Sequence, residues 1–399
     1  MTRVLPLGTA LLLAVIATVG PLACNLWTKP ESGQAATPSR RVKLDRPSLP
    51  LPNLTERELA RFKQGDALFE ATVRESDGLG PLYVRDACNA CHADDGRGPG
   101  LVTKAAPLNG DPALAQKLLP FGSTERPYTT AGARVPLLAP QDARVRVTHR
   151  LPPAVFGRGY LEAIAGADLE RLAVRATART GSARGRLNRL KNGAIGRFGI
   201  KARIATLAEF AADALSGDMG VSSPTHPEEQ PGPEGLRDDA KPGVDFSTEQ
   251  VEQMLDYLRG LQIPERRHAE LPTRGPALFA KARCSECHEP SFETSRSYPV
   301  AALSGVRAEV YSDLLLHDMG EALSDGLSEE SAGPREFRTA PLIGLRFLPS
   351  LLHDGSAKTV EQAIMAHGAA DSEGRDSARA FAALSSAEQR ELLKFVEAL

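Results

Sequence analysis

Two copies of one short cysteine–histidine motif are the residues of this sequence best suited to carry chemistry. The copies read CNACH and CSECH, and their reactive side chains are Cys88, Cys91 and His92 in the first and Cys284, Cys287 and His288 in the second. In a Cys-x-x-Cys-His motif the two thiols add to the vinyl groups of a porphyrin, and the adjacent histidine reaches the iron. We therefore expect two covalently bound haem c groups, with His92 and His288 as the proximal iron ligands.

Paired cysteines also occur in redox-active disulfides and in zinc sites. Neither pair here has a third and a fourth ligand at the spacing of a zinc finger. Two complete copies of the pentapeptide in one exported chain favour haem attachment over two separate disulfides.

The N-terminus predicts export. Arg3 precedes an apolar stretch over residues 4–22 that proline and glycine interrupt, a pattern typical of a secretory signal peptide and not of a stable membrane span. Cys24 follows in the sequence PLAC, which resembles a lipoprotein cleavage box, although a proline replaces the usual aliphatic residue. Two outcomes stay open: a lipid on this cysteine tethers the protein to a membrane, or the cysteine is discarded after cleavage. We expect a signal peptide at 1–23, a flexible tether at 24–52 and a periplasmic location.

An internal repeat surrounds the two motifs. The segment GDALF at 65–69 precedes the first motif, and GPALF at 275–279 precedes the second. Residues 247–261 and 385–399 align without gaps, and each begins with a serine capping box and continues with the apolar spacing of an amphipathic helix. Few stretches alternate like strands. We therefore expect a mainly α fold with two cytochrome c-like haem domains, the first at 53–264, enlarged by a long middle segment, and the second at 265–399.

The composition is that of an ordinary globular protein. With 42% hydrophobic and 25% charged residues, the 399-residue chain is long enough for two domains, and general disorder is excluded. A net charge of −2 argues against a general nucleic-acid-binding protein. Charge is nevertheless polarised, since residues 171–203 contain ten basic and no acidic side chains, and acidic residues dominate 228–252. The basic run is a solvated face, a docking surface for an acidic redox partner or a counter-charge for haem propionates.

Several longer segments of the sequence resemble a known family. They read DGLGPLYVRDACNACHADDGRG from Asp77, RFGIKARIATLAEFAADALSGDMG from Arg197, YSDLLLHDMG from Tyr311, FRTAPLIGLRFLPSLLHDG from Phe337 and TVEQAIMAHG from Thr359. The family is that of the di-haem oxidoreductases, labelled thiol oxidoreductase-like or peroxidase, which are relatives of the bacterial di-haem cytochrome c peroxidases and of the methylamine-dehydrogenase maturation enzymes. The resemblance covers most of residues 77–399 and implies an oxidoreductase with two haems.

The sequence departs from this family at three places. Relatives carry an acidic Asp-x-Asn-x-Asp-Gly loop where this chain reads TGSARGR at 180–186, so a calcium site there lacks its oxygen ligands. Ile200 and Phe210 stand where the family tends to have tryptophan and glutamine. The only tryptophan, Trp27, lies in the predicted tether. A tryptophan bridge between the haems, as in the related peroxidases, is therefore excluded.

The resemblance also guides the assignment of the sixth ligand of the second iron. In related peroxidases a methionine ligand falls twelve residues after the glycine of a His-Asp-Gly motif, and the same count from Gly355 arrives at His367. Met365 lies two residues earlier, about 200° away around a helix, so the two side chains cannot both face the iron. We expect His367 to bind the iron and Met365 to pack. In the alternative arrangement, His367 only lines an open site.

Three further histidines are candidates for roles near the haems. His149 is the best-placed candidate for a sixth ligand of the first haem, although a surface position explains it as well. His317 and His353 lie in family-like segments, and we expect them to hydrogen-bond propionates or ligands and not to bind iron. The first iron is thus left without a firm sixth ligand.

The leading functional prediction is a haem-dependent oxidoreductase, specifically a peroxidase that reduces hydrogen peroxide. One haem would bind peroxide at an open axial position, while the other relays electrons from a small redox protein or another partner protein. Cleavage of the O–O bond requires proton transfer. We assign this transfer to Glu209, which lies in the stretch LAEF resembling a glutamate-bearing peroxidase segment, with Glu162 as the second candidate.

Two alternative functions stay open. The first is a pure electron-transfer cytochrome with both irons six-coordinate. The second is a maturation enzyme that oxidises a side chain of a partner protein. A thiol-oxidoreductase activity finds no support, because Cys24 is the only cysteine outside the haem motifs.

Overall fold

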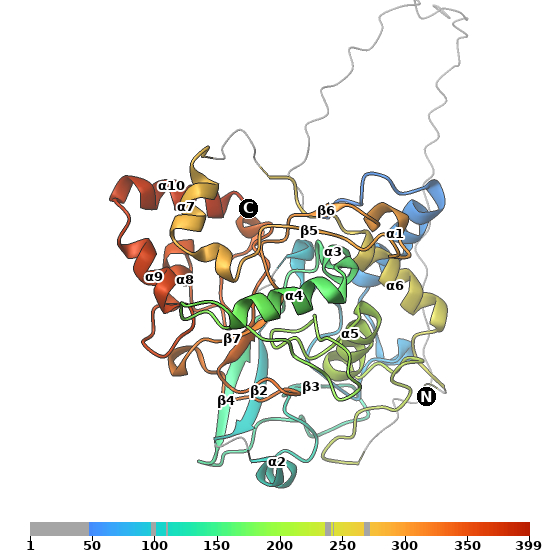
Figure 1. Cartoon of the computed structure of the whole chain (residues 1–399). Coiled ribbons are helices and arrows are strands. Elements are labelled where there is room, and N and C mark those ends of the chain that lie inside the picture. Colours follow the sequence, from blue (N-terminus) through green and yellow to red (C-terminus); the bar gives the residue numbers. More distant parts are fainter. Residues whose placement is uncertain (1–47, 97–100, 109–110, 236–240, 242, 267–271) are drawn as a thin grey trace, which may run out of the picture. The chain divides into compact units, whose positions relative to one another are not determined.

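The computed structural model describes residues 48–399, except 97–100, 109–110, 236–240, 242 and 267–271 (Figure 1). The predicted signal peptide, most of the predicted tether, Cys24 and Trp27 lie outside the described residues. Within the described part, no helix is both long and apolar enough to span a membrane.

Helices are the longest elements of the described chain. They are α1 (Glu56–Glu70), α2 (Pro112–Leu118), α3 (Arg158–Ala163), α4 (Gly166–Thr177), α5 (Leu207–Ala214), α6 (Thr248–Gly260), α7 (Gly275–Lys281), α8 (Val360–Ala366), α9 (Arg375–Ala382) and α10 (Ser386–Glu397). The strands are short and form two-stranded antiparallel sheets. The pairs are β1 (Leu82–Tyr83) with β3 (Tyr128–Thr129), β2 (Val102–Pro107) with β4 (Val145–Arg150), β5 (Phe292–Glu293) with β6 (Arg307–Ala308), and β7 (Leu316–Asp318) with β8 (Glu336–Arg338).

The prediction of a mainly α fold is only partly correct, because the fold is mixed. Small two-stranded sheets accompany the helices. The longest of them pairs β2 with β4, in a register that runs from Val102 opposite Arg150 to Pro107 opposite Val145. The valines of β4 (VRVTHR) are half-buried or exposed, and the buried residue of the strand is Arg150. The strand therefore lacks a hydrophobic alternation, and its partner lies 38–48 residues away in the chain.

The repeated segments form two similar helix pairs. Helix α1 packs against α6, and α7 packs against α10 (Figure 1). A glycine lies at each crossing. A methyl group on Gly65 would come within 2.1 Å of the carbonyl oxygen of Gln253, and one on Gly275 within 2.5 Å of the ring of Phe395. The predicted capping boxes are present at the starts of α6 and α10. The glycines in GDALF and GPALF thus allow two helices to approach closely beside each motif.

Apolar side chains gather in two main clusters. The larger joins α1, α3, α4, α5 and α6, and it also takes in residues from the chain after the second motif, such as Phe292 and Leu315. The smaller joins α7, α8, α9 and α10 and includes Phe279, Phe381 and Phe395. Each cluster contains one of the two helix pairs. The division into two haem domains at residue 264 stays a prediction.

Gly65→Ala should lower the free energy of unfolding by about 1–3 kcal/mol, because the added methyl group overlaps the backbone of α6. Equilibrium urea unfolding followed by circular dichroism measures the change. Gly217→Ala is the matched control, since nothing lies within 4 Å of a methyl group there, and its effect should stay within about 0.5 kcal/mol. Equal losses in the two variants would contradict a close crossing of α1 and α6.

Candidate haem sites

The second motif begins directly after α7. Arg283 adopts a left-handed conformation (φ 62°) that ends the helix, and Cys284–Glu286 forms a single 3-10 turn. The amide of His288 donates to the carbonyl of Cys284 at 2.9 Å, which closes the turn. As a result Cys284, Cys287 and His288 all line one cavity.

This cavity has a volume of about 240 Å³ and is walled mainly by apolar side chains. A single water molecule needs only about 10–15 Å³, so the cavity is large enough for a much bigger ligand. The apolar wall includes Phe279, Ile343, Leu345, Leu348, Leu351, Val360, Ile364 and Val396. A large apolar cavity that presents two thiols and an imidazole fits a covalently attached planar macrocycle such as haem.

Two imidazoles in this cavity are oriented by backbone carbonyls. Nδ1 of His288 lies 3.0 Å from the carbonyl oxygen of Tyr311, and Nδ1 of His367 lies 2.6 Å from that of Ala363. A carbonyl can only accept, so Nδ1 is the donor in both rings and Nε2 is left for a metal. Burial lowers the pKa of His288 to about 4 and also lowers the pKa of His367, which keeps both rings neutral as iron ligation requires. Met365, in contrast, is 51% exposed.

The other two histidines of the cavity make different contacts. His317 lies between two carboxylates, with Nε2 3.1 Å from Asp313 and Nδ1 2.7 Å from Glu373. Burial opposes protonation, but the neighbouring Cys287 sulfur and the Asp313 carboxylate outweigh it and raise the pKa of His317 well above its ordinary value. His353 stacks on Phe337, with ring centroids 4.3 Å apart. Because both ring nitrogens of His317 are engaged, this residue is suited to hydrogen bonding and not to ligation.

The first motif lies against the larger hydrophobic cluster. Phe69 of α1 packs beside the imidazole of His92, with ring centroids 6.0 Å apart. Burial lowers the pKa of His92 to about 4, and the nearby carbonyl of Pro153 opposes this shift in part. Nδ1 of His92 is nevertheless buried without a hydrogen bond of good geometry among the described residues. A neutral, buried imidazole beside the Cys88 and Cys91 thiols fits haem attachment here too.

The cysteines of both motifs form no disulfide in the described chain. Burial raises the pKa of Cys88 to about 12, of Cys91 to about 11 and of Cys284 to about 12. A redox-active Cys-x-x-Cys pair instead keeps one thiol at a lowered pKa, because the thiolate is the nucleophile. The thiols therefore suit haem attachment better than disulfide exchange.

Comparison with known proteins agrees with this geometry. The family described as "Di-haem oxidoreductase, putative peroxidase" matches residues 33–109 and 137–399, which is most of the chain. The chain belongs to this di-haem oxidoreductase family. No curated protein matches it. Among solved structures, hydrazine synthase of Kuenenia stuttgartiensis, pressurized with xenon, is 15% identical to it, with a TM-score of 0.38 over 94% of this chain and 100% of that chain. A similarity this low carries no argument about the fold.

In this di-haem oxidoreductase, neither glutamate predicted for proton transfer lines the cavity of the second motif. Glu209 is exposed in the first turn of α5. Glu162 accepts hydrogen bonds from the amide of Leu207 at 2.8 Å, Arg259 at 2.7 Å and the Tyr298 hydroxyl at 2.5 Å. Burial acts to raise the pKa of Glu162, but the hydrogen bonds from Arg259 and Tyr298 outweigh it and hold the pKa below its ordinary value. Glu162 is thus a fixed anion that joins α3 to α5 and α6, and proton transfer by either glutamate stays a prediction.

His149, the candidate sixth ligand of the first haem, lies on β4 with its side chain exposed. Its Nδ1 is 3.3 Å from the hydroxyl of Thr103 on the paired strand β2. The surface interpretation therefore fits its position better than iron ligation does.

Two residues that lie near both motifs could not be recognised from the sequence. Arg158 is buried at the start of α3, where it lines the second cavity while its charge acts on His92 of the first motif. Its Nε donates to the carbonyl of Ala154 at 2.6 Å. Pro153 also lines the second cavity and lies near His92. Pro153 and Arg158 therefore line the cavity of the second motif and also act on His92 of the first motif.

Most of the basic run at 171–203 is engaged in contacts within the chain. Its ion pairs join Arg171 to Asp168, Arg175 to Glu289, Arg186 to Glu336, Arg189 to Glu170, Lys201 to Asp325 and Arg203 to Asp213. Arg184 and Arg197 donate to backbone carbonyls. Four of these arginines, Arg171, Arg175, Arg186 and Arg189, stay exposed despite their ion pairs, so a docking role for the run stays a prediction.

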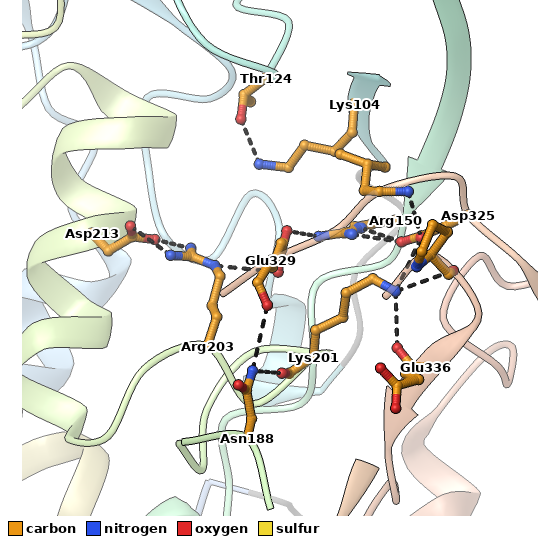
Figure 2. A network of polar contacts seen from close by, with 12 residues as sticks. Lys104, Thr124, Arg150, Asn188, Lys201, Arg203, Asp213, Asp325, Glu329 and Glu336 are labelled. Carbon is orange, nitrogen blue, oxygen red and sulfur yellow. Dashed lines mark hydrogen bonds and ion pairs between the residues drawn. The ribbon is translucent and has the colours of Figure 1, made fainter. Parts of the chain in front are cut away.

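Two residues of this run belong to a buried charge network (Figure 2). The Lys201 ammonium and the Asp325 carboxylate, both fully buried, lie 3.1 Å apart, and Arg150 donates to the same carboxylate from Nε at 3.1 Å. Glu329 contacts Arg150 and Arg203. The Lys201 ammonium also donates to the carbonyls of Gly333 and Glu336, each at 2.9 Å. The network thus joins the middle segment to residues 325–336.

The same network supports one wall of the second cavity. The ammonium nitrogen of Lys201 lies 4.1 Å from the ring centroid of Phe337. Phe337 in turn stacks on His353, and both line the cavity. A buried cation against an aromatic face is stabilising when it is desolvated. Lys201 therefore holds the Phe337–His353 pair in place.

Lys201→Met should lower the free energy of unfolding by about 3–5 kcal/mol, because Asp325 stays buried with one of its two cations removed. Urea unfolding measures the loss. Arg171→Met is the control, since its pair with Asp168 is exposed and should contribute about 0–1 kcal/mol. A loss for Lys201→Met no larger than the control's would show that the buried network does not carry stability.

His367→Ala should convert one low-spin haem signal of the purified holoprotein to high-spin, while covalent haem content is unchanged. The reason is that His367 offers its free Nε2 to the cavity that contains His288. Electron paramagnetic resonance of the ferric protein is the measurement. Met365→Ala is the matched control and should leave the spectrum as it is, because that side chain is exposed. A low-spin signal lost in Met365→Ala and kept in His367→Ala would reverse the assignment.

Proposed function

We propose that the protein is an exported c-type di-haem oxidoreductase that reduces hydrogen peroxide with electrons passed between two covalently bound haems. One observation carries the proposal: the second motif and His367 converge on one apolar cavity, and the wall of that cavity also contacts His92 of the first motif. Two haems bound at these motifs would have Pro153 and Arg158 as shared neighbours, which supports electron exchange between them.

The residues of the chain would divide the work as follows. Cys284 and Cys287 would hold the second haem, with His288 and His367 on its iron. Cys88 and Cys91 would hold the first haem, with His92 on its iron. The iron, when bound, supplies the electron-transfer and peroxide chemistry. The protein supplies neutral imidazoles held by backbone carbonyls and a mainly apolar cavity wall.

The two sites would differ in role. His288 and His367 would both hold the second iron, which would transfer electrons. His149, the candidate sixth ligand of the first iron, is exposed, so the first site would be the one that takes peroxide. Proton transfer during O–O cleavage is assigned to Glu209, since Glu162 is held as an anion by three donors.

An electron-transfer cytochrome is the second candidate function. The pairing of His288 with His367 favours it, because a bis-histidine haem is suited to electron transfer and not to binding a substrate. This function would require a sixth ligand on the first iron as well.

Export and the electron donor are part of the same proposal. The signal-like residues 1–23 and the motifs for covalent haem support a periplasmic protein that Cys24 could tether to a membrane. A small redox protein would be the electron donor.

The haem-loaded protein should contain two covalent haems and should consume hydrogen peroxide when a reduced small cytochrome is supplied. The double variant Cys284→Ala/Cys287→Ala should retain one covalent haem, measured as the pyridine haemochrome, and should lose the cytochrome-dependent rate. Ferric holoprotein without any high-spin signal, and without peroxide turnover, would instead establish the electron-transfer cytochrome.

A further inference from the structure

Tyr257 of α6 lies at the end of an aromatic path to the first motif. Its side chain is 1% exposed. Its ring centroid lies 5.2 Å from that of Phe69, and the Phe69 centroid lies 6.0 Å from that of His92. Phe62 also packs against the tyrosine, with ring centroids 5.0 Å apart. Aromatic contact is thus continuous from Tyr257 to the imidazole that would bind the first iron.

The hydroxyl of Tyr257 is paired with a buried carboxylate. It donates a hydrogen bond to Oδ1 of Asp95, a residue that is 4% exposed and follows the first motif. Asp66 of α1 is a second carboxylate near the hydroxyl, and its charge adds to the rise in the pKa of Tyr257. A carboxylate in direct hydrogen-bond contact is a ready acceptor for the phenolic proton.

The second half of the chain offers an internal comparison. The repeat places Phe395 of α10 at the position of Tyr257. Phe395 packs on Phe279 at 5.8 Å, and Phe279 lies 6.4 Å from His288. The position equivalent to Tyr257 is therefore filled beside the second motif by a ring without a hydroxyl. Tyr311 also packs on Phe279, with ring centroids 5.6 Å apart, but among the described contacts of the two aromatic groups only the Tyr257 hydroxyl donates to a carboxylate.

We propose that Tyr257 is a redox-active tyrosine that gives up one electron to the oxidised cofactor at the first motif. In this step the O–H bond breaks, the electron moves along the Phe69–His92 path, and the proton moves to Asp95. The products are a neutral tyrosyl radical, a protonated Asp95 and a cofactor reduced by one electron. Oxidation makes a phenol far more acidic, so a base already hydrogen-bonded to it accepts the proton without any movement of the chain.

This step rests on the proposed function, since hydrogen peroxide is the oxidant that supplies the oxidised cofactor. It would store one oxidising equivalent on the chain until a donor arrives. Tyrosine suits this role because the only tryptophan of the sequence is Trp27, far from both motifs in the chain.

The test uses the haem-loaded protein frozen after mixing with one equivalent of hydrogen peroxide and examined by electron paramagnetic resonance. Wild type should give a radical signal whose hyperfine structure narrows when ring-deuterated tyrosine is incorporated. Tyr257→Phe should lose this signal and keep its haem content, because the repeat already accommodates phenylalanine at the equivalent position. Asp95→Asn keeps a hydrogen-bond acceptor but cannot take the proton, so its radical should form more slowly and in lower yield.

Tyr298→Phe is the matched control. Tyr298 also donates to a carboxylate, that of Glu162, but no described ring contact joins it to His92 or His288. Its variant should keep the radical. A signal that persists in Tyr257→Phe, or that is absent from wild type while peroxide is consumed, would overturn the tyrosine proposal and leave the peroxidase function standing.

A second oxidant separates the two proposals when peroxide gives no reaction. Photogenerated tris(bipyridine)ruthenium(III) oxidises the holoprotein without peroxide. A radical that appears in wild type and is lost in Tyr257→Phe under this oxidant would support the tyrosine and overturn the peroxide-reducing function. Identical spectra of the two proteins would overturn the tyrosine as well.

Discussion

The close crossing of two helices beside each Cys-x-x-Cys-His motif is the constraint on which the rest of the structure depends. Gly65 and Gly275 allow α6 and α10 to approach α1 and α7 at distances that any side chain would prevent. The crossings bring Tyr257 and Phe395 against Phe69 and Phe279, which in turn contact His92 and His288. The positions of His92 and His288 therefore depend on the packing of a helix pair as well as on the short motif itself.

Features that depend on local spacing could be predicted from the sequence. The capping boxes of α6 and α10 are present because serine and a residue three positions later suffice to form them. The opposite orientation of His367 and Met365 also follows from helical geometry, and the structure places the first in a cavity and the second at the surface. Iron ligation itself stays a prediction, since it depends on a group that the chain alone does not specify.

Features that depend on distant partners could not be predicted. Arg150, Lys201 and Asp325 meet across more than a hundred residues, and nothing in the periodicity around Lys201 distinguishes it from the exposed arginines before it. Glu162 looked like a proton-transfer residue in sequence, yet its partners come from three different segments. The pairing of β2 with β4 could not be predicted for the same reason, because the sequence of a strand does not identify its partner.

The position of two cavity residues has a consequence for assembly. Pro153 and Arg158 line the cavity of the second motif and also lie near His92, so a cofactor bound at one motif would rest against residues that the other motif shares. Linkage requires this effect to be mutual: whatever the first docking event adds to the affinity of the second site, the second adds to the first. If two haems bind as proposed, their docking would therefore be coupled before any thioether bond forms.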